Sequence, residues 1–462
     1  MDLKNKKIAV LGLGIEGEDV CRYLMSQGAN DITVFDQKTA EELGEVYKNF
    51  QFSCPSGRRA IFNFQLGPDY LKNGLRGFDV IFRSPAFKLS LPEIVEAKNS
   101  GAIISSATKL FFDLCPAKII GVTGTKGKGT TSTLIYEILK KAGKKVFLAG
   151  NIGEPMLALL PKLDKKSWVV LELSSFQLQD LEKSPHIAVV LFITSEHLDY
   201  HSSTEEYIQA KANLVRWQKE DDFAVLNADN QTSSSFALLT LAKVYYFSRE
   251  KKVNGGFVKD GQIYLLDKLV GPTSKLQILG VHNWENICAA STAAFLAGAD
   301  LNSIKKVVFS FKGLEHRLEF VRELGGVKFY NDSFSTTPET TIAAIRAFSQ
   351  PIILIAGGSE KGSDYNQLGK EIAQSRVKTL ILIGKTAPKI KKVVQKSGFR
   401  GKIVYKPGEM EKIVKRAFTE AEKGDVVLLS PACASFDMFK NYKDRGWQFK
   451  KYVWEISEKS RP

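Results

Sequence analysis

The stretch GVTGTKGKGTT, residues 121–131, follows an apolar run at residues 117–120 and leads into a helical pattern at residues 131–141. A strand, a glycine-rich turn and a helix in this order form an anion cradle, because the glycines let several backbone N–H groups point at one phosphate. Lys128 stands where a P-loop lysine contacts the β- and γ-phosphates. The hydroxyl that usually follows this lysine is replaced by Gly129 and comes one residue later, at Thr130. The stretch predicts a nucleotide-phosphate site, and an ordinary glycine-rich turn is the alternative.

Length and composition indicate a globular protein of several domains. The chain has 462 residues, with 44% hydrophobic and 25% charged residues, which is enough for two to four domains. Its five cysteines show no CxxC spacing, which argues against a zinc site or a disulfide framework. We see no signal-peptide pattern and no apolar run of about 18 residues. We therefore expect a cytoplasmic protein without a membrane partner.

The net charge of +15 is spread along the chain, without a basic tail or interleaved aromatic and basic clusters. Such a diffuse excess of positive charge is typical of a solvated surface. The alternative is that it attracts small anionic substrates. We therefore expect no nucleic-acid partner. We also expect a monomer whose partners are small-molecule substrates.

The first segment, residues 1–108, begins with a strand followed by Gly12, Gly14 and Gly17 in GxGxxG spacing. Asp36 follows about 20 residues later, where it can bind a ribose hydroxyl. Taken alone, this pattern predicts a dinucleotide fold, but other nucleotides can use the same turn. A further strand at residues 79–85 ends in a turn that is expected at the same edge of the sheet.

Apolar strand patterns alternate with helical patterns through two further segments, residues 109–313 and 314–462. Near-continuous apolar strands of this kind are typical of parallel sheets covered on both faces. An Asp260-Gly261 turn between alternating residues predicts one antiparallel hairpin. We predict an α/β protein of three successive domains: a Rossmann-like one, a P-loop-type one with a mainly parallel sheet, and a second Rossmann-like one.

Polar residues at the ends of the central strands predict a metal site. Glu172 ends the strand at residues 168–173 and can bind a metal on the phosphates. His197 follows a later strand beside acidic residues, which suits a second metal position. A solvated glutamate at a strand end is the alternative for Glu172, and a structural histidine is the alternative for His197. From the residues alone, we interpret Lys211 and His201 as surface residues.

Eight short motifs along the whole chain resemble those of the ATP-dependent Mur ligases. They are GTKGKGT (124–130), GNIG (150–153), ELSSFQL (172–178), HLD (197–199), HNWEN (282–286), GLEHR (313–317), NDS (331–333) and SPACASFDMFKN (430–441). The resemblance implies an enzyme of peptidoglycan synthesis, and hence of cell-wall biogenesis, cell shape and cell division. The last motif looks most like the member that joins D-glutamate to UDP-N-acetylmuramoyl-L-alanine through an acyl phosphate.

The resemblance also implies a role for individual residues. The residues implied for ATP are Gly124, Thr125, Lys126, Gly127, Lys128, Gly129, Thr130, Asn283, Asn286, Arg317 and Asp332. Those implied for the UDP-substrate are Gly14, Ile15, Glu16, Asp36, Ser84 and Asn151. Those implied for the incoming amino acid are Thr336, Lys361, Ser435 and Tyr442.

The resemblance further implies ATP with two Mg²⁺ ions as cofactors. The implied metal ligands are Thr130, Glu172, His197 and Lys211 as a carbamate, and the implied catalytic residues are Lys128, His197 and Lys211. A carbamate changes a cationic lysine into an anion, and it forms on the neutral amine, which desolvation favours. This replaces our interpretation of Lys211 as a surface residue.

The sequence departs from the family pattern at Phe334, where close members often carry Lys, and at Lys126, where Asn is common. The nearest rivals are a sibling ligase that adds another amino acid and folylpolyglutamate synthase, and the GxGxxG turn and residues 430–441 argue against the latter. An NAD-dependent oxidoreductase built on the first segment leaves the P-loop unexplained. Glu172, His197 and Lys211 together argue against a nucleotide-gated binding module.

Overall fold

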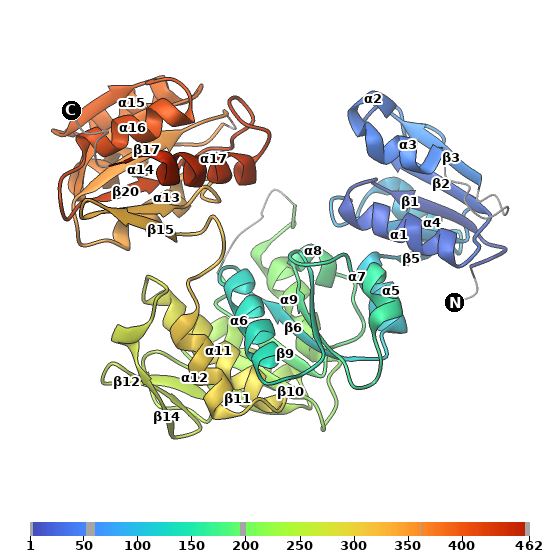
Figure 1. The fold of residues 1–462 in the computed structure, drawn as a ribbon. Coiled ribbons are helices and arrows are strands. Elements are labelled where there is room, and N and C mark those ends of the chain that lie inside the picture. Colours follow the sequence, from blue (N-terminus) through green and yellow to red (C-terminus); the bar gives the residue numbers. More distant parts are fainter. Residues whose placement is uncertain (1–2, 52–60, 195–199, 361, 458–462) are drawn as a thin grey trace. The chain divides into compact units, whose positions relative to one another are not determined.

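The computed structural model describes residues 3–51, 61–194, 200–360 and 362–457. Within them the chain forms two compact units. The first comprises residues 1–275 and 281–309, and the second comprises residues 276–280 and 310–462. Each unit is described by itself below (Figure 1).

The first unit begins with a parallel sheet in the order β3-β2-β1-β4-β5. Its strands are β1 (Lys7–Leu11), β2 (Asp31–Asp36), β3 (Ile61–Leu66), β4 (Val80–Arg83) and β5 (Ile103–Ser105). The accompanying helices are α1 (Ile15–Ser26), α2 (Ala40–Leu43), α3 (Glu45–Gln51), α4 (Pro92–Asn99) and α5 (Ala107–Leu114). The order reverses between β1 and β4, and in such sheets ligands bind beyond the carboxyl ends of the strands at the reversal.

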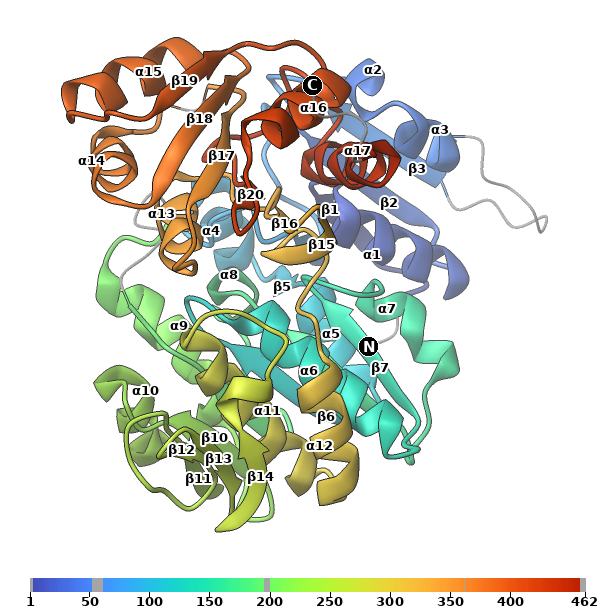
Figure 2. The ribbon, with the colours of Figure 1, turned by 60° about the vertical axis from the view of Figure 1, so that its left-hand side comes forward.

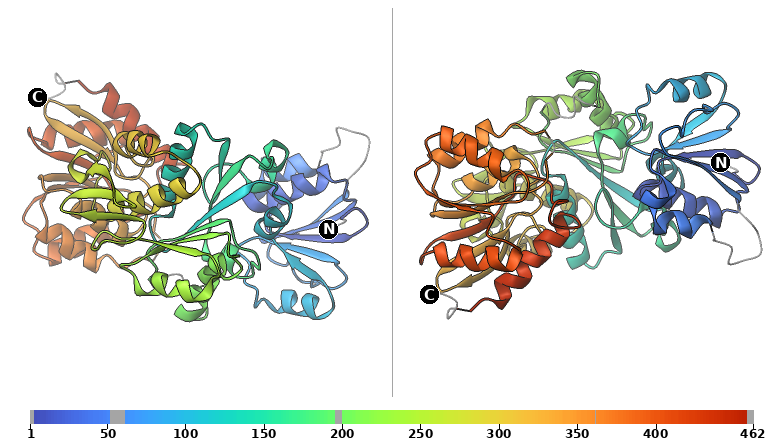
Figure 3. Two further views of the ribbon diagram at one scale, coloured as in Figure 1. Left: turned by 90° about the horizontal axis from the view of Figure 1, so that it is seen from below. Right: turned by 90° about the horizontal axis from the view of Figure 1, so that it is seen from above.

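A second parallel sheet of the same unit has the order β11-β10-β9-β6-β8-β7 and twists between its helices (Figure 3). Its strands are β6 (Lys118–Thr123), β7 (Val146–Gly150), β8 (Trp168–Glu172), β9 (Ile187–Val190), β10 (Phe223–Asn227) and β11 (Lys243–Phe247). Its helices are α6 (Lys128–Lys141), α7 (Met156–Leu159), α8 (Ser175–Leu178), α9 (Thr204–Arg216), α10 (Gln231–Ser235), α11 (His282–Leu296) and α12 (Leu301–Ser310). Strand β6 lies at the centre, so that its carboxyl end is the switch point of this sheet.

The predicted hairpin is confirmed in a small antiparallel sheet of the order β12-β13-β14. Its strands are β12 (Gly256–Lys259), β13 (Gln262–Leu265) and β14 (Lys268–Pro272). Asp260 and Gly261 both have positive φ, 50° and 68°, and close the turn between β12 and β13. Short 3₁₀ turns occur at Leu160–Lys162, Phe236–Leu239 and Thr273–Lys275.

The second unit has a sheet in the order β15-β16-β20-β17-β18-β19, in which only the pairing of β15 with β16 is antiparallel among the described strands. The strands are β15 (Glu319–Leu324), β16 (Val327–Asn331), β17 (Ile352–Gly357), β18 (Val377–Ile383), β19 (Lys402–Tyr405) and β20 (Val426–Leu429). The helices are α13 (Pro338–Arg346), α14 (Asn366–Gln374), α15 (Ala387–Lys396), α16 (Met410–Glu420) and α17 (Tyr442–Glu455).

The strands of this last sheet carry apolar side chains on both faces, and helices cover both of these faces. Helices α16 and α17 pack on one face through a cluster that includes Phe329, Phe418 and Phe449. Helices α13, α14 and α15 pack on the other face (Figure 2) through a cluster that includes Leu354 and Leu380. This double cover is what the near-continuous apolar strands predicted.

Two expectations about the elements need adjustment. The apolar run at residues 187–194 predicts one long strand, but β9 ends at Val190. Leu191 still donates to Thr123 O at 2.9 Å, while Thr125 donates to Phe192 O at 2.8 Å, so the chain bends here towards the glycine-rich turn. The strand predicted at residues 79–85 is also shorter, Val80–Arg83. No described helix has both the length and the apolar character needed to cross a bilayer.

Candidate active site

The glycine-rich turn lies at the carboxyl end of β6 and opens helix α6, as the sequence predicts. Gly124 has φ 152°, and a Cβ there would lie 2.7 Å from Leu191 Cβ. Gly127 has φ 88° and is the N-cap of α6, and a Cβ there would collide with Asn286 Oδ1. These positions therefore require glycine, and they leave the backbone N–H groups at the positive end of a helix dipole.

Lys128 and Lys211 both donate to the same carbonyl oxygen in this turn. The distance from Lys128 Nζ to Gly124 O is 2.9 Å, and that from Lys211 Nζ to Gly124 O is 3.1 Å. Lys211 is only 2% exposed and lies 4.6 Å from the centroid of the Tyr207 ring. The interpretation of Lys211 as a surface lysine is therefore wrong, because helix α9 turns this residue into the protein towards the turn.

Tyr207 belongs to this site, although sequence reasoning did not select it. Its hydroxyl lies 2.9 Å from Thr125 Oγ1, and Thr125 Oγ1 also accepts from Thr194 N at 3.0 Å. Tyr207 precedes Lys211 by four residues, which places both on one face of α9. That spacing is the signal that could have found it.

Helix α11 brings two predicted ATP residues next to the turn. Asn286 Oδ1 accepts from Thr131 Oγ1 at 3.3 Å, and Asn286 Nδ2 donates to Asn283 Oδ1 at 2.8 Å. Both asparagines are 6% exposed. Lys126 is exposed at the tip of the turn, whereas Thr130 is buried in the first turn of α6.

Glu172 ends β8 directly beside β6, where it pairs with Val122 in the sheet register. It is 6% exposed, so the alternative of a solvated strand-end glutamate is wrong. Its carbonyl oxygen accepts from Asn151 N at 3.0 Å, which ties the predicted UDP-substrate residue Asn151 to the same strand end. His197 lies outside the described residues.

The first sheet also carries its predicted residues at a switch point. Asp36 Oδ2 accepts from Leu13 N at 2.7 Å, so this carboxylate fixes the turn after β1 from the end of β2. Gly14 and Ile15 are exposed in that turn. A Cβ on Gly12 would lie 2.7 Å from Ser84 Oγ, which shows how closely the turns after β1 and β4 approach.

Glu16 connects the first sheet to the segment after Glu172. Its Oε1 accepts from Gln177 Nε2 at 2.6 Å, and Gln177 in turn caps helix α8 at Ser174. Burial raises the pKa of Glu16 to about 7, and the nearby Arg83 partly opposes this shift.

Arg83 also connects the first sheet to the segment after Glu172, and sequence reasoning missed this role. Its side chain is 1% exposed, and it forms an ion pair with Asp180 at 3.0 Å. It also donates to Phe176 O at 3.2 Å and to Tyr200 Oη at 3.3 Å. An arginine next to Ser84 gave no sign of this role, because its partners come from a distant part of the chain.

His201, expected at the surface, is 1% exposed. Its Nε2 lies 3.0 Å from Ser175 Oγ, and its ring stacks on Phe176 with centroids 5.4 Å apart. The surface interpretation is therefore wrong. The polar character of the HLDYH segment concealed an aromatic cluster that only the fold assembles.

In the second unit, predicted residues collect at the ends of β16 and β20. Asp332 is 4% exposed and accepts from Ser430 Oγ at 2.7 Å and from Leu318 N at 3.1 Å. Burial raises the pKa of Asp332 to about 6, and the hydrogen bonds from Ser335 and Ser430 oppose this shift. Ser435 is 2% exposed in the loop after β20. Thr336 and Tyr442 are half-buried, and Lys361 lies outside the described residues.

Buried Arg445 joins the loops after these two strands. It donates to Ser333 O at 2.8 Å and to Cys433 O at 3.1 Å, and its Nε donates to Ser333 Oγ at 2.9 Å. Burial lowers its pKa to about 10. A planar guanidinium with fixed donors is suited to hold two loops at one separation.

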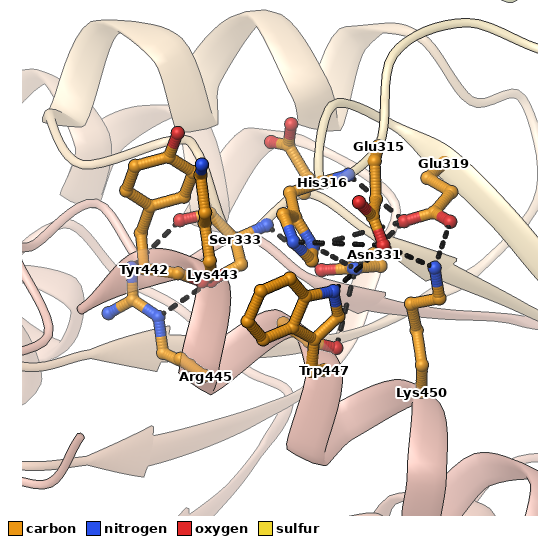
Figure 4. Close-up of polar contacts among 12 residues, drawn as sticks. Glu315, His316, Glu319, Asn331, Ser333, Tyr442, Lys443, Arg445, Trp447 and Lys450 are labelled. Atoms are coloured by element: carbon orange, nitrogen blue, oxygen red, sulfur yellow. Dashed lines mark hydrogen bonds and ion pairs between the residues drawn. The ribbon is translucent and has the colours of Figure 1, made fainter. Parts of the chain in front are cut away.

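Two carboxylates, those of Glu315 and Glu319, pair with Lys450 (Figure 4). Lys450 Nζ lies 2.9 Å from Glu315 Oε1 and 2.6 Å from Glu319 Oε1. Together with His316, these carboxylates have the spacing of a metal site. Because the Lys450 ammonium pairs with both carboxylates, the geometry favours an ion-pair cluster that fixes the GLEHR loop.

Comparisons with known proteins identify two family domains in the chain. The family profile described as "Mur ligase middle domain" matches residues 122–294, and that described as "Mur ligase, glutamate ligase domain" matches residues 316–433. The solved UDP-N-acetylmuramate-alanine ligase from Thermotoga maritima has a TM-score of 0.59 at 17% identity, with 98% of this chain and 99% of that chain covered. This structural similarity shows that the two chains share a three-domain α/β fold.

Curated relatives are much more similar in sequence. UDP-N-acetylmuramoylalanine–D-glutamate ligase of Acetivibrio thermocellus is 45% identical, with 98% of this chain and 97% of the relative covered. The protein of the same name from Ruminiclostridium cellulolyticum is 43% identical over the same shares of the two chains. At this identity over nearly the whole length of both chains, the protein belongs to the Mur ligase family.

Proposed function

We propose that the protein joins D-glutamate to UDP-N-acetylmuramoyl-L-alanine in an ATP-dependent step of peptidoglycan synthesis. The full-length identity to relatives named UDP-N-acetylmuramoylalanine–D-glutamate ligase carries the choice of substrates. The glycine-rich turn at the centre of the second sheet supports the use of ATP. Because the reaction uses ATP, we propose that it takes place in the cytoplasm. We also propose that the protein acts as a monomer.

The proposed chemistry has two steps. The free carboxylate of the UDP-substrate attacks the γ-phosphorus of ATP, which gives an acyl phosphate and ADP. The amine of D-glutamate then attacks the acyl carbon, and the tetrahedral intermediate loses phosphate to form the amide. Such transfers need positioning and charge neutralisation more than covalent help from the protein. Lys128 and the N–H groups at the start of α6 supply both.

The residues present fit Mg²⁺ on the ATP phosphates. The hydroxyl of Thr130 and the carboxylate of Glu172 are oxygen donors of the kind Mg²⁺ prefers, and both residues are buried at the ends of adjacent elements. We propose these two residues and His197 as ligands. The ion would neutralise charge on the phosphates during transfer.

We also propose that Lys211 is carbamylated. Two ammonium groups that donate to one buried carbonyl oxygen repel each other, and at Gly124 O they are those of Lys128 and Lys211. A carbamate on Lys211 replaces this repulsion with attraction and adds an anion that can position Mg²⁺.

The substrates are assigned to two sets of residues. We propose Gly14, Ile15, Glu16, Asp36, Ser84 and Asn151 for the UDP-substrate, and Thr336, Lys361, Ser435 and Tyr442 for D-glutamate. Asn283, Asn286, Arg317 and Asp332 complete the proposed ATP set, with residues 124–130. The switch-point positions of the two turns in the first unit support the first set.

Phosphate release from ATP tests the reaction. We expect release only with UDP-N-acetylmuramoyl-L-alanine and D-glutamate together, and not with L-glutamate or other amino acids in a panel. Preferred release with a different amino acid would contradict the specificity while leaving the ligase chemistry in place.

Lys211→Ala tests the carbamate. We expect it to lower kcat by at least about 100-fold, because the anion that positions Mg²⁺ on the phosphates is lost. Short carboxylic acids should restore part of the activity by occupying the carbamate position. Lys128→Ala is the control, since a carboxylic acid cannot replace a lost cation. Full activity of Lys211→Ala without additives would contradict the proposal.

A further inference from the structure

Arg317 and Phe334 form a stacked pair within the second unit. The guanidinium carbon of Arg317 lies 3.8 Å from the centroid of the Phe334 ring. At this distance the positive charge lies against the negative face of the ring, an arrangement that attracts a cation. The two residues come from different loops, one before β15 and one after β16.

Two hydrogen bonds, one between backbone groups and one from backbone to a carboxylate, hold these loops in register. Phe334 N donates to His316 O at 3.0 Å, and Leu318 N donates to Asp332 Oδ1 at 3.1 Å. The residues on both sides of Arg317 are therefore tied to the segment that carries Phe334. The register of the two loops therefore places Arg317 against Phe334.

A second aromatic ring supports Phe334. Tyr442 meets it edge to face, with centroids 5.1 Å apart and planes at 89°. Tyr442 is itself fixed, because its carbonyl oxygen accepts from Ser333 Oγ at 2.7 Å (Figure 4). Phe334 remains 37% exposed, so the pair lies at an accessible edge of the unit.

We propose that Phe334 is a positioning residue that holds the Arg317 guanidinium as a ready anion ligand for a phosphate group of ATP. This inference rests on the proposed use of ATP and extends it by one residue. An arginine stacked by its face has fewer conformations to lose on binding, and its N–H donors lie in the plane of the guanidinium, away from the ring. An alkyl side chain would fill the same space without attracting the cation.

The stacking can be measured without any turnover. In arginine-labelled protein, the Nε–H resonance of Arg317 should show an upfield ring-current shift, and Arg317→Lys identifies the resonance. Phe334→Leu should remove the shift, and Phe334→Tyr, which keeps the ring, should retain it. An Arg317 resonance that is the same in Phe334→Leu as in the wild type overturns the stacking.

Kinetics test the consequence for ATP. Phe334→Leu should raise the KM of ATP about 3- to 10-fold, the effect of losing one partly exposed cation–π contact. The KM of the UDP-substrate, whose proposed residues belong to the first unit, should change less than about 2-fold, and Phe334→Tyr should restore the KM of ATP. A merely structural role would lower the active fraction and leave both KM values alone.

The outcomes separate this inference from the proposed function. If wild-type protein releases no amino-acid-dependent phosphate, the proposed function fails, whatever the resonance shows. If the wild type is active and Phe334→Leu leaves the KM of ATP unchanged, or Phe334→Tyr behaves like Phe334→Leu, the positioning role is overturned.

Discussion

The protonation of Glu16 depends on the fold, because its carboxyl group is buried at the start of α1. Its Oε2 has no hydrogen-bond partner among the described residues. Burial raises the pKa from 4.5 to about 7, repulsion by Asp19 adds to the shift, and the Gln177 bond and Arg83 oppose it. Between these two pH values the unfolded chain gives up a proton that the folded protein keeps.

Folding stability should therefore fall as the pH rises from about 4.5 to about 7, and this loss should persist above pH 7. Glu16→Gln keeps the acceptor for Gln177 and has no charge to bury. At pH 8 it should be more stable than the wild type by about 1–3 kcal/mol, and at pH 4.5 by close to zero. Urea unfolding at both pH values measures the difference.

Glu18→Gln, on the same turn, is the matched control for this experiment. It removes an ion pair with Arg22 at the surface, so it should change stability by only about 0.5 kcal/mol at either pH. A gain for Glu16→Gln that is as large at pH 4.5 as at pH 8 would contradict the assignment.

Single residues also show where sequence reasoning stops. Glu172, Thr130 and the asparagines of α11 lie where their motifs predict, because a strand end or a helix start fixes them locally. From the residues alone, Lys211 and His201 look like surface residues, because their burial depends on Gly124 and Ser175, which only the tertiary fold brings near. A charge in an amphipathic helix is ordinarily a solvated one.

Helix α6 has a glycine with positive φ at each end, and the two glycines differ in what surrounds them. Gly127 precedes it with φ 88°, and Gly143 follows it with φ 73°. A Cβ on Gly127 would collide with Asn286 Oδ1, whereas a Cβ on Gly143 would meet no atom within 4 Å.

Alanine at either position should cost about 1–2 kcal/mol of stability through backbone strain. Only Gly127→Ala should also displace Asn286 and lower kcat/KM for ATP, by about 10- to 100-fold. Chemical denaturation and steady-state kinetics of the two variants separate strain from misplacement. Equal kinetic losses in both would show that helix stability alone governs ATP use.

The elements themselves were largely predictable, and their ends were not. The strand, turn and helix around residues 121–131 follow from local pattern alone. The apolar run at residues 187–194 could not reveal that the ladder ends at Val190. The residues after it bond to Thr123 at the end of β6 and to Thr125 in the turn. An apolar run looks the same whether it continues a sheet or leaves it.

The whole molecule forms two compact units, and the proposed substrate residues are distributed unevenly between them. The residues proposed for the UDP-substrate, Gly14 to Asn151, all belong to the first unit, and those proposed for D-glutamate belong to the second. A ligand that binds the folded form of one unit stabilises that unit alone.

Unfolding should therefore occur in two steps, and the UDP-substrate should shift only the first unit's step. At 100 times its Kd the substrate should add about 2.7 kcal/mol to the free energy of unfolding of that unit.

Tryptophan fluorescence can follow the first unit alone. The chain has five tryptophans, and Trp447 and Trp454 are those of the second unit. Because both are half exposed or more, at 51% and 59%, a Trp447→Phe/Trp454→Phe variant should fold and report the first unit by fluorescence. Circular dichroism of the same sample follows both units, so the second step is an internal control. If the substrate shifted both steps equally, its binding would require the second unit as well, and the assignment of the UDP-substrate to the first unit alone would be wrong.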